Sequence, residues 1–176
     1  PYLVRIRPAD ISQHSRLTYF SGLGPDGQPQ WSADEQAATP LFHQDVIGEF
    51  SVAYCPSVRR YIMLYNSSDP RGITMRSASA PWGPWSEGEV IFEPWRDGGY
   101  GHFMHIPANF QGDTHDTVND PRRKNEWGGE YGPYIMGRFT TGIPGQCRLF
   151  YTMSTWNPYQ VIVMQTDLKL ETRDKR

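Results

Sequence analysis

The sequence contains no apolar run that approaches the roughly twenty residues of a membrane-spanning helix, so no membrane span is predicted. It also lacks a basic excess, because its 17 Lys and Arg stand against 19 Asp and Glu in 176 residues. Binding to nucleic acid requires clustered positive charge, so no nucleic-acid partner is expected. The opening residues contain neither an initiating Met nor the apolar segment of a signal peptide, and we therefore expect a partial chain.

Motifs for metals and nucleotides are absent as well. Only two cysteines occur, Cys55 and Cys147, and no Cys/His cluster has the spacing of a zinc site. Neither a glycine-rich phosphate loop nor a Gly-x-Ser-x-Gly elbow is present. The sequence therefore predicts no cofactor and no metal site. Both cysteines lie beside strand-like runs, which favours two buried thiols over the alternative of one disulfide.

What the sequence does contain is aromatic residues, glycine and proline: 6 Trp, 10 Tyr, 8 Phe, 17 Gly and 15 Pro. This turn-dense composition, without a sustained run of helix formers, predicts an all-β fold. The clearest strands alternate with Pro- and Gly-containing turns between residues 47 and 95. They are Phe50–Cys55, Arg60–Tyr65, Gly72–Ala78 and Glu87–Phe92. Four short strands in about forty-five residues are typical of one blade of a β-propeller.

The same kind of unit recurs along the chain. Further strands are predicted at residues 2–6, 16–21, 134–140, 148–153 and 160–166. Arg16, Arg60 and Arg148 each begin a Tyr-containing strand, and the intervals between them are 44 and 88 residues. A period near 44 residues fits propeller blades, so we predict a partial β-propeller domain over residues 1–170 with about three to four blades.

Two other segments stand apart from the predicted blades. The polar, turn-rich segment 112–129 is expected to be an exposed loop inserted into a blade, and residues 171–176 form a charged tail. Propellers close with roughly four to eight blades. We therefore expect a missing N-terminal segment or a partner chain to complete the ring.

Six motifs occur in an order and wording that resemble one protein family. They are GEFSVAY at Gly48, RYIMLYN at Arg60, SAPWGPWS at Ser79, DGGYGHFMH at Asp97, YGPYIMGRFT at Tyr131 and YTMSTWNPYQV at Tyr151. The family was long known only as a domain of unknown function, and its members are associated with endo-D-arabinanase activity. The resemblance covers residues 2–170. It implies a five-bladed propeller of a secreted or cell-surface glycoside hydrolase that acts on D-arabinan, the furanose polymer of mycobacterial cell walls.

Glu49 is the predicted catalytic residue. Glycoside hydrolysis requires two carboxyl groups, one protonated and one ionised, on either side of the scissile bond. Glu49 stands at the entrance to the strand FSVAYC, and alternation places it on one face with Ser51 and Ala53, a face that we expect to line the central funnel. The opposite, aromatic face is expected to pack between blades. We expect Glu49 to be partly buried, as suits a general acid; the alternative is a structural Glu that accepts backbone hydrogen bonds.

The motif DGGYGHFMH contributes three predicted substrate-binding residues, Asp97, Tyr100 and His102. Its three glycines indicate a close approach of the backbone to a ligand or to a neighbouring blade. His102 and His105 lie three positions apart, and such residues point to opposite faces of a strand, so a shared metal ion is not expected. For His102, a hydrogen bond to a sugar hydroxyl and a packing role both stay open.

Four more residues complete the predicted site: Tyr131, Arg138, Trp156 and Asn157. Arg138 stands between apolar residues, so an inward-facing side chain requires a carboxylate such as Glu49 or a substrate oxygen; the alternative is a surface Arg on an edge strand. Trp156 offers a face for the C–H surface of a sugar, and Asn157 offers both a donor and an acceptor for hydroxyls. The alternative for the aromatic residues is packing between blades.

The predicted function is that of a glycoside hydrolase-like propeller that cleaves a furanose polysaccharide such as D-arabinan internally. Two alternatives are a non-catalytic carbohydrate-binding propeller and a structural or interaction domain. The surroundings of Glu49 separate the three. A second carboxylate within about ten ångströms in one cleft favours hydrolysis, Glu49 alone in the cleft favours binding, and a buried Glu49 bonded only to backbone leaves a structural role.

Overall fold

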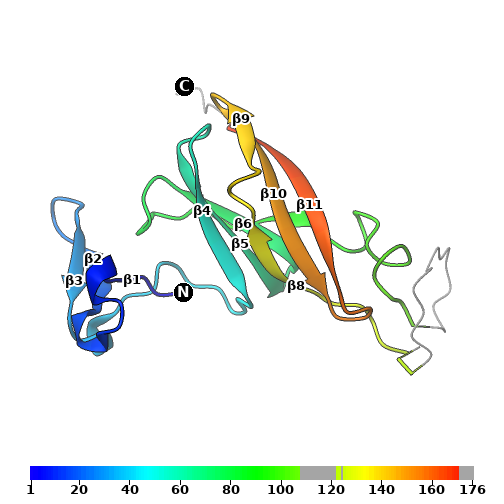
Figure 1. Ribbon diagram of the computed structural model, residues 1–176, viewed down its shortest axis with the longest axis horizontal. Coiled ribbons are helices and arrows are strands. Elements are labelled where there is room, and N and C mark those ends of the chain that lie inside the picture. Colours follow the sequence, from blue (N-terminus) through cyan, green and yellow to red (C-terminus); the bar gives the residue numbers. More distant parts are fainter. Residues whose placement is uncertain (108–121, 124, 171–176) are drawn as a thin grey trace. The chain divides into compact units, whose positions relative to one another are not determined.

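The computed structural model describes residues 1–107, 122–123 and 125–170. These residues form strands and short 3-10 turns, and none of their helices is long and apolar enough to cross a membrane. The predicted all-β fold is confirmed (Figure 1). The chain divides into two units: residues 1–45 with 78–86, and residues 46–77 with the described residues from 87 onward.

The first unit contains a three-stranded sheet in the order β1-β2-β3. Its elements are β1 (Val4–Arg5), η1 (Pro8–Asp10), η2 (His14–Arg16), β2 (Thr18–Leu23), β3 (Pro29–Ser32) and η3 (Glu35–Ala37). Phe20 on β2 is buried, and its ring meets Trp31 edge to face with 6.0 Å between centroids. The strand predicted at 16–21 begins later, at Thr18, because the residues before it close the turn η2.

The four strands predicted between residues 47 and 95 form a four-stranded sheet of the second unit, in chain order. They are β4 (Phe50–Cys55), β5 (Arg60–Ser68), β6 (Arg71–Ala78) and β7 (Glu89–Phe92). β4 and β5 are antiparallel, with Phe50 opposite Tyr65 and Cys55 opposite Arg60. Arg59 closes the turn between them with a φ of 52°, in the left-handed region.

The second sheet of this unit is built around a long central strand. Its strands are β8 (Glu130–Ile135), β9 (Thr141–Ile143), β10 (Gln146–Thr155) and β11 (Gln160–Lys169). β10 pairs with β11 along its whole length, and β8 and β9 share its other edge. The strand predicted at 134–140 is wrong in its bounds. It ends at Ile135 because residues 137–139 turn, with Phe139 N donating to the carbonyl of Met136 at 2.9 Å.

The core of the second unit lies where the two sheets meet. β8 contacts both β4 and β5, and Ile135 N donates to Ser51 Oγ at 2.9 Å across the boundary between the sheets. Buried side chains from both sheets fill this boundary; among them are Ile62, Leu64, Ile73, Leu149, Tyr151 and Met153. Each such side chain stabilises the fold by about 1.5–3 kcal/mol. Both cysteines are buried free thiols, which confirms the expectation for them.

Two of the predicted segments fall wholly or largely outside the described residues. The predicted loop 112–129 falls largely outside the described residues, and the predicted tail 171–176 falls entirely outside them. The described residues form three sheets, one in the first unit and two in the second, and a ring of blades around a common axis stays a prediction.

Candidate functional site

Chain direction gathers many of the predicted residues at one end of the second unit. β4 begins here, β5 ends and β6 begins here, β8 begins here, and the turn from β10 to β11 lies here. We call this region the site end; it comprises residues 47–49, 66–71, 92–105, 126–131 and 155–160. Hydrogen bonds join its segments, since His105 N donates to Asn157 O at 2.9 Å and Trp156 N donates to Gly129 O at 2.7 Å.

An ion pair between the two sheets lies at the centre of the site end. Arg71 Nε, at the start of β6, is 3.4 Å from Oε2 of Glu130, at the start of β8. The Glu130 side chain is only 3% exposed, whereas that of Arg71 is 45% exposed. Arg71 Nη2 also donates to the carbonyl of Gly128 at 3.1 Å. The guanidinium therefore has one side bound to protein and another open to solvent.

Aromatic rings pack next to this ion pair. The Tyr100 hydroxyl donates to the same carbonyl of Gly128 at 3.0 Å, and the Arg71 guanidinium lies 5.6 Å from the centroid of the Tyr100 ring. Trp95, Tyr100 and Trp127 form a cluster whose ring centroids are 4.7–5.1 Å apart. Burial of the carboxyl raises the pKa of Glu130, although Arg71 acts in the opposite direction. Burial also raises the pKa of Tyr100 to about 12, so its hydroxyl stays protonated and keeps donating.

Gly128 has to be glycine for this arrangement. A Cβ at this position would lie 2.6 Å from the carbonyl oxygen of Asn157 and 2.9 Å from the backbone nitrogen of His105. Gly128 N donates to His105 O at 2.7 Å, which fixes the segment against the neighbouring backbone. Its carbonyl is thereby held where both Arg71 and Tyr100 reach it.

A pocket of about 300 Å³ opens beside the ion pair. It is lined by Val46, Asn66, Ser67, Ser68, Arg71 and Glu130. Asn66 Oδ1 is buried there and has no hydrogen-bond partner among the described residues. An unpaired buried acceptor is rare in native proteins, and a hydroxyl donor from a ligand would satisfy it. The pocket thus combines a cation, a carboxyl group and a vacant acceptor.

A second group of rings lies at the turn from β10 to β11. Trp156 is 40% exposed and Tyr159 66% exposed, and their ring centroids are 5.0 Å apart. The guanidinium of Arg123 lies 4.5 Å from the Trp156 ring centroid. Desolvation raises the pKa of Tyr131, and the neighbouring Tyr159 and the negative charge of Glu49 act in the same direction. We call Tyr131, Trp156 and Tyr159 the aromatic platform.

The structure places Glu49 at this end but corrects its expected surroundings. Glu49 precedes β4 and is exposed, so the expected partial burial is wrong. The alternation along β4 is confirmed, but the burial of its faces is reversed. Ser51 and Ala53 are half-buried because they face β8, whereas the aromatic face with Phe50 and Tyr54 is exposed.

Asp97 and His102 lie at the site end as exposed residues. The Asp97 carboxylate accepts from Glu93 N at 2.7 Å and from both Nε and Nη2 of Arg96, at 2.9 and 2.7 Å. Hydrogen bonding to Arg96 lowers the pKa of Asp97, so this carboxylate is ionised and committed to its own turn. Among the described residues no group of three or more His, Cys, Asp or Glu side chains is placed to hold a metal ion.

Asn157 and Arg138 depart most from the expected geometry. Asn157 is buried and its Nδ2 donates to the carbonyls of Arg123 and Glu126 at 3.3 and 3.4 Å, so it holds the backbone of the site end. Arg138 lies beyond the far end of β8, in an exposed turn, so the expectation that it faces inward is wrong. The reason is that the chain leaves the sheet at Met136, before it reaches Arg138.

The family model described as Domain of unknown function (DUF4185) matches residues 1–165 of the chain. The chain belongs to this family. Its description names no activity, so the arabinanase part of the resemblance stays a prediction. A comparison with curated proteins finds no match.

Sequence reasoning missed three residues of the site end in this DUF4185 member. They are Asn66, Arg71 and Glu130. Glu130 was the most accessible to prediction, because a lone carboxylate before the aromatic strand YGPYI resembles the position of Glu49. Its pairing with Arg71 depends on contact between two sheets, which no local pattern encodes.

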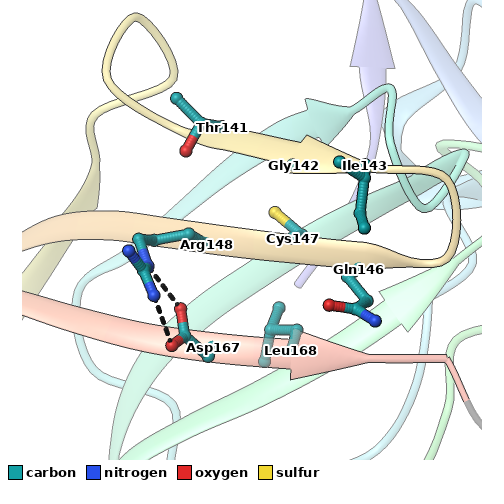
Figure 2. A pocket seen from close by; sticks show the side chains of 8 residues that line it. All are labelled: Thr141, Gly142, Ile143, Gln146, Cys147, Arg148, Asp167 and Leu168. Carbon is teal, nitrogen blue, oxygen red and sulfur yellow. Dashed lines mark hydrogen bonds and ion pairs between the residues drawn. The ribbon is translucent and has the colours of Figure 1, made fainter.

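A larger hollow, of about 420 Å³, lies at the opposite end of the second sheet of this DUF4185 member (Figure 2). Its lining comes from β9, β10 and β11, and Figure 2 shows Arg148 and Asp167 bound to each other. Arg148 Nε and Nη2 donate to the two Asp167 oxygens at 2.7 and 3.0 Å. Both charged groups are exposed and bind each other, so this hollow presents fewer groups for binding a ligand than the site end does.

Proposed function

We propose that the site end binds a furanose polysaccharide such as D-arabinan, and that the chain is part of a glycoside hydrolase-like, five-bladed β-propeller that cleaves the polymer internally. The observation that carries the proposal is the exposed aromatic platform, on the same end of the fold as the pocket beside Arg71 and Glu130. In this proposal the protein is extracellular or on the cell surface. An upstream segment or a partner chain supplies the further blades.

The chemistry of the platform suits a neutral sugar chain. Trp156 and Tyr159 expose ring surface that stacks on the C–H faces of sugar rings. Asn66 Oδ1 offers an acceptor for a hydroxyl, and the open side of the Arg71 guanidinium offers donors. A polysaccharide presents apolar faces and hydroxyls in alternation, which matches rings next to a polar pocket.

For cleavage, Glu130 and Glu49 are the proposed carboxyl pair. Burial favours the protonated form of Glu130, which suits the donor of a proton to the leaving oxygen. Glu49 is exposed, which suits the ionised partner. The role of general acid expected for Glu49 therefore moves to Glu130 in this proposal, and Glu49 keeps a catalytic role.

Binding without cleavage is the second candidate, and one observation favours it. Arg71 lies 3.4 Å from Glu130, and a cation at that distance favours the ionised carboxylate, which cannot donate a proton. In that case Glu130 and Arg71 orient hydroxyl groups of the polymer, and the platform supplies most of the affinity.

The experiment uses the purified full-length protein, with any upstream blades present, and D-arabinan. Binding is measured by isothermal titration calorimetry, and cleavage by the release of arabino-oligosaccharides. We expect Trp156→Ala and Tyr159→Ala each to weaken binding about two- to tenfold, since one stacked ring contributes roughly 0.5–1.5 kcal/mol. Phe139→Ala, an exposed aromatic beyond the far end of β8, is the matched control and should bind as the unmodified chain does.

The outcomes distinguish the two candidates. Loss of product in Glu130→Gln and Glu49→Gln, with binding retained, supports hydrolysis. Binding without any product in the unmodified full-length protein supports the non-catalytic candidate. Equal affinity of the platform variants, the Phe139 control and the unmodified chain would contradict a sugar site at this end.

A further inference from the structure

The two cysteines of the chain meet at the boundary between the two sheets of the second unit. Cys55 is the last residue of β4 and Cys147 the second residue of β10, and they are 3% and 2% exposed. Both belong to the same cluster of buried side chains. Burial raises the pKa of the Cys147 thiol, and Cys55 and Ser57 are among the neighbouring groups that influence it. Residues that lie 92 positions apart in the chain are thus neighbours in the core.

The backbone around them shows independently that these segments are docked. Ser57 Oγ lies 3.4 Å from Cys55 Sγ, and the carbonyl of Ser57 accepts from Gly145 N at 2.9 Å. Ser57 also packs so closely on Gly142 that a Cβ there would overlap its side chain. Gly142 is the register partner of Cys147, and Figure 2 shows the two side by side on β9 and β10. The turn after β4 therefore sits directly on the hairpin that carries Cys147.

We propose that Cys55 and Cys147 form a disulfide bond when the chain folds in the presence of a disulfide oxidant. The bond would tie the sheet β4–β7 to the sheet β8–β11 at the end opposite the site end. This inference does not rest on the proposed function, because it uses only the packing of the two thiols.

The chemistry balances with a small disulfide such as oxidised glutathione. The Cys55 thiol loses its proton, attacks one sulfur of the oxidant and releases one glutathione as the thiolate. The Cys147 thiol then loses its proton, attacks the Cys55 sulfur and releases the second glutathione. The two protons pass to the two released thiolates, so two protein thiols become one disulfide and one oxidant becomes two thiols.

The timing of the reaction follows from burial. Thiolates, not thiols, attack disulfides, and burial raises the pKa of Cys147 to about 12. The folded dithiol is also shielded from the oxidant. We therefore expect the bond to form readily during refolding and much more slowly, by at least tenfold, in the folded chain.

The test is refolding of the full chain from denaturant with oxidised and reduced glutathione, alongside a refolding with reductant alone. Intact mass and thiol titration under denaturing conditions count the free thiols, and peptide mapping identifies the linked peptides. We expect one link between Cys55 and Cys147. The oxidised form should unfold roughly 5–15 °C above the reduced form, because the link closes a long loop.

Variants sharpen the comparison. Cys55→Ser and Cys147→Ser should each abolish the difference in melting temperature between oxidising and reducing refolding. If a variant does not fold, the oxidised and reduced forms of the unmodified chain still give the result. Two free thiols after oxidative refolding, glutathione adducts on both cysteines, or a link only between chains would each overturn the proposal.

Discussion

Arg71 and Glu130 are 59 positions apart in the chain, yet Arg71 Nε lies 3.4 Å from Glu130 Oε2. The pair joins the first strand positions of β6 and β8, which belong to different sheets. A buried carboxylate needs a partner, and Arg71 also binds the carbonyl of Gly128, on which Tyr100 converges. The pair therefore couples the position of the pocket wall to the packing of the two sheets.

Removal of the cation should destabilise the fold. Arg71→Ala leaves the Glu130 carboxylate buried without its partner, and we expect the free energy of unfolding to fall by about 1–3 kcal/mol. Arg148→Ala is the matched control, because the ion pair of Arg148 with Asp167 is exposed and such pairs contribute little. Urea unfolding followed by tryptophan fluorescence measures both. Equal stability of the two variants would argue against a structural role for the Arg71 pair.

Glu130 should make stability depend on pH with a definite sign. Burial raises the pKa of Glu130 above its ordinary value of 4.5, so the folded state binds the proton more tightly than the unfolded state. This contribution is full below 4.5 and is lost as the pH rises through the raised pKa. Glu130→Gln removes the titrating group, so its stability relative to the unmodified chain should increase as the pH rises across this window.

The measurement is a set of urea unfolding curves between about pH 4 and pH 8. Glu89→Gln, at an exposed position of β7, is the control and should follow the curve of the unmodified chain. A constant difference between Glu130→Gln and the unmodified chain at every pH would mean that Glu130 has the same pKa in both states.

Two substitutions of Tyr100 measure separately how much its hydrogen bond and its packed ring contribute to stability. Tyr100→Phe keeps the ring against Trp95 and Trp127 and loses the bond to Gly128, so we expect a loss of about 0.5–1.5 kcal/mol. Tyr100→Ala also removes the ring and should cost about 3–5 kcal/mol. Thermal and urea unfolding measure the difference. If Phe and Ala cost the same, the ring cluster contributes nothing to the fold.

Much of the fold could be predicted because its strands carry local signals. FSVAYC and RYIMLY alternate or are continuously apolar and are joined by a turn with proline, and they form β4 and β5 with the predicted bounds at their starts. The strand predicted at 134–140 failed because its apolar run continues past Met136, while the backbone already turns at Gly137. Composition alone does not reveal where a strand loses its pairing partner.

The sequence predicts the location of several site residues correctly, but it does not predict their burial. The residue types of Glu49, Trp156 and Tyr131, next to predicted strands, indicate site residues, and chain direction brings them to one end of the fold. Their burial could not be predicted, because it depends on which sheet covers which face. Glu49 is exposed for this reason, and the buried carboxyl at this end belongs to Glu130, whose partner comes from the other sheet.

Gly48 offers a way to move Asn66 without touching the ion pair. Gly48 N donates to the carbonyl of Asn66 at 3.0 Å, and a Cβ on Gly48 would overlap the Asn66 side chain. Because Asn66 ends in a rotatable amide, Gly48→Ala should displace that amide from the pocket at a modest cost in stability, about 1–2 kcal/mol. If Asn66 Oδ1 accepts a hydroxyl of the proposed ligand, affinity for D-arabinan should fall about fivefold or more.

Gly137→Ala is the matched control for this change. Gly137 lies in the turn after β8, and a Cβ there would meet nothing within 4 Å. This variant should keep both the stability and the affinity of the unmodified chain. Calorimetric titration with D-arabinan and urea unfolding measure the two quantities in parallel. A Gly48→Ala chain that binds normally would show that Asn66 takes no part in recognition, since its amide is the group that the new methyl displaces.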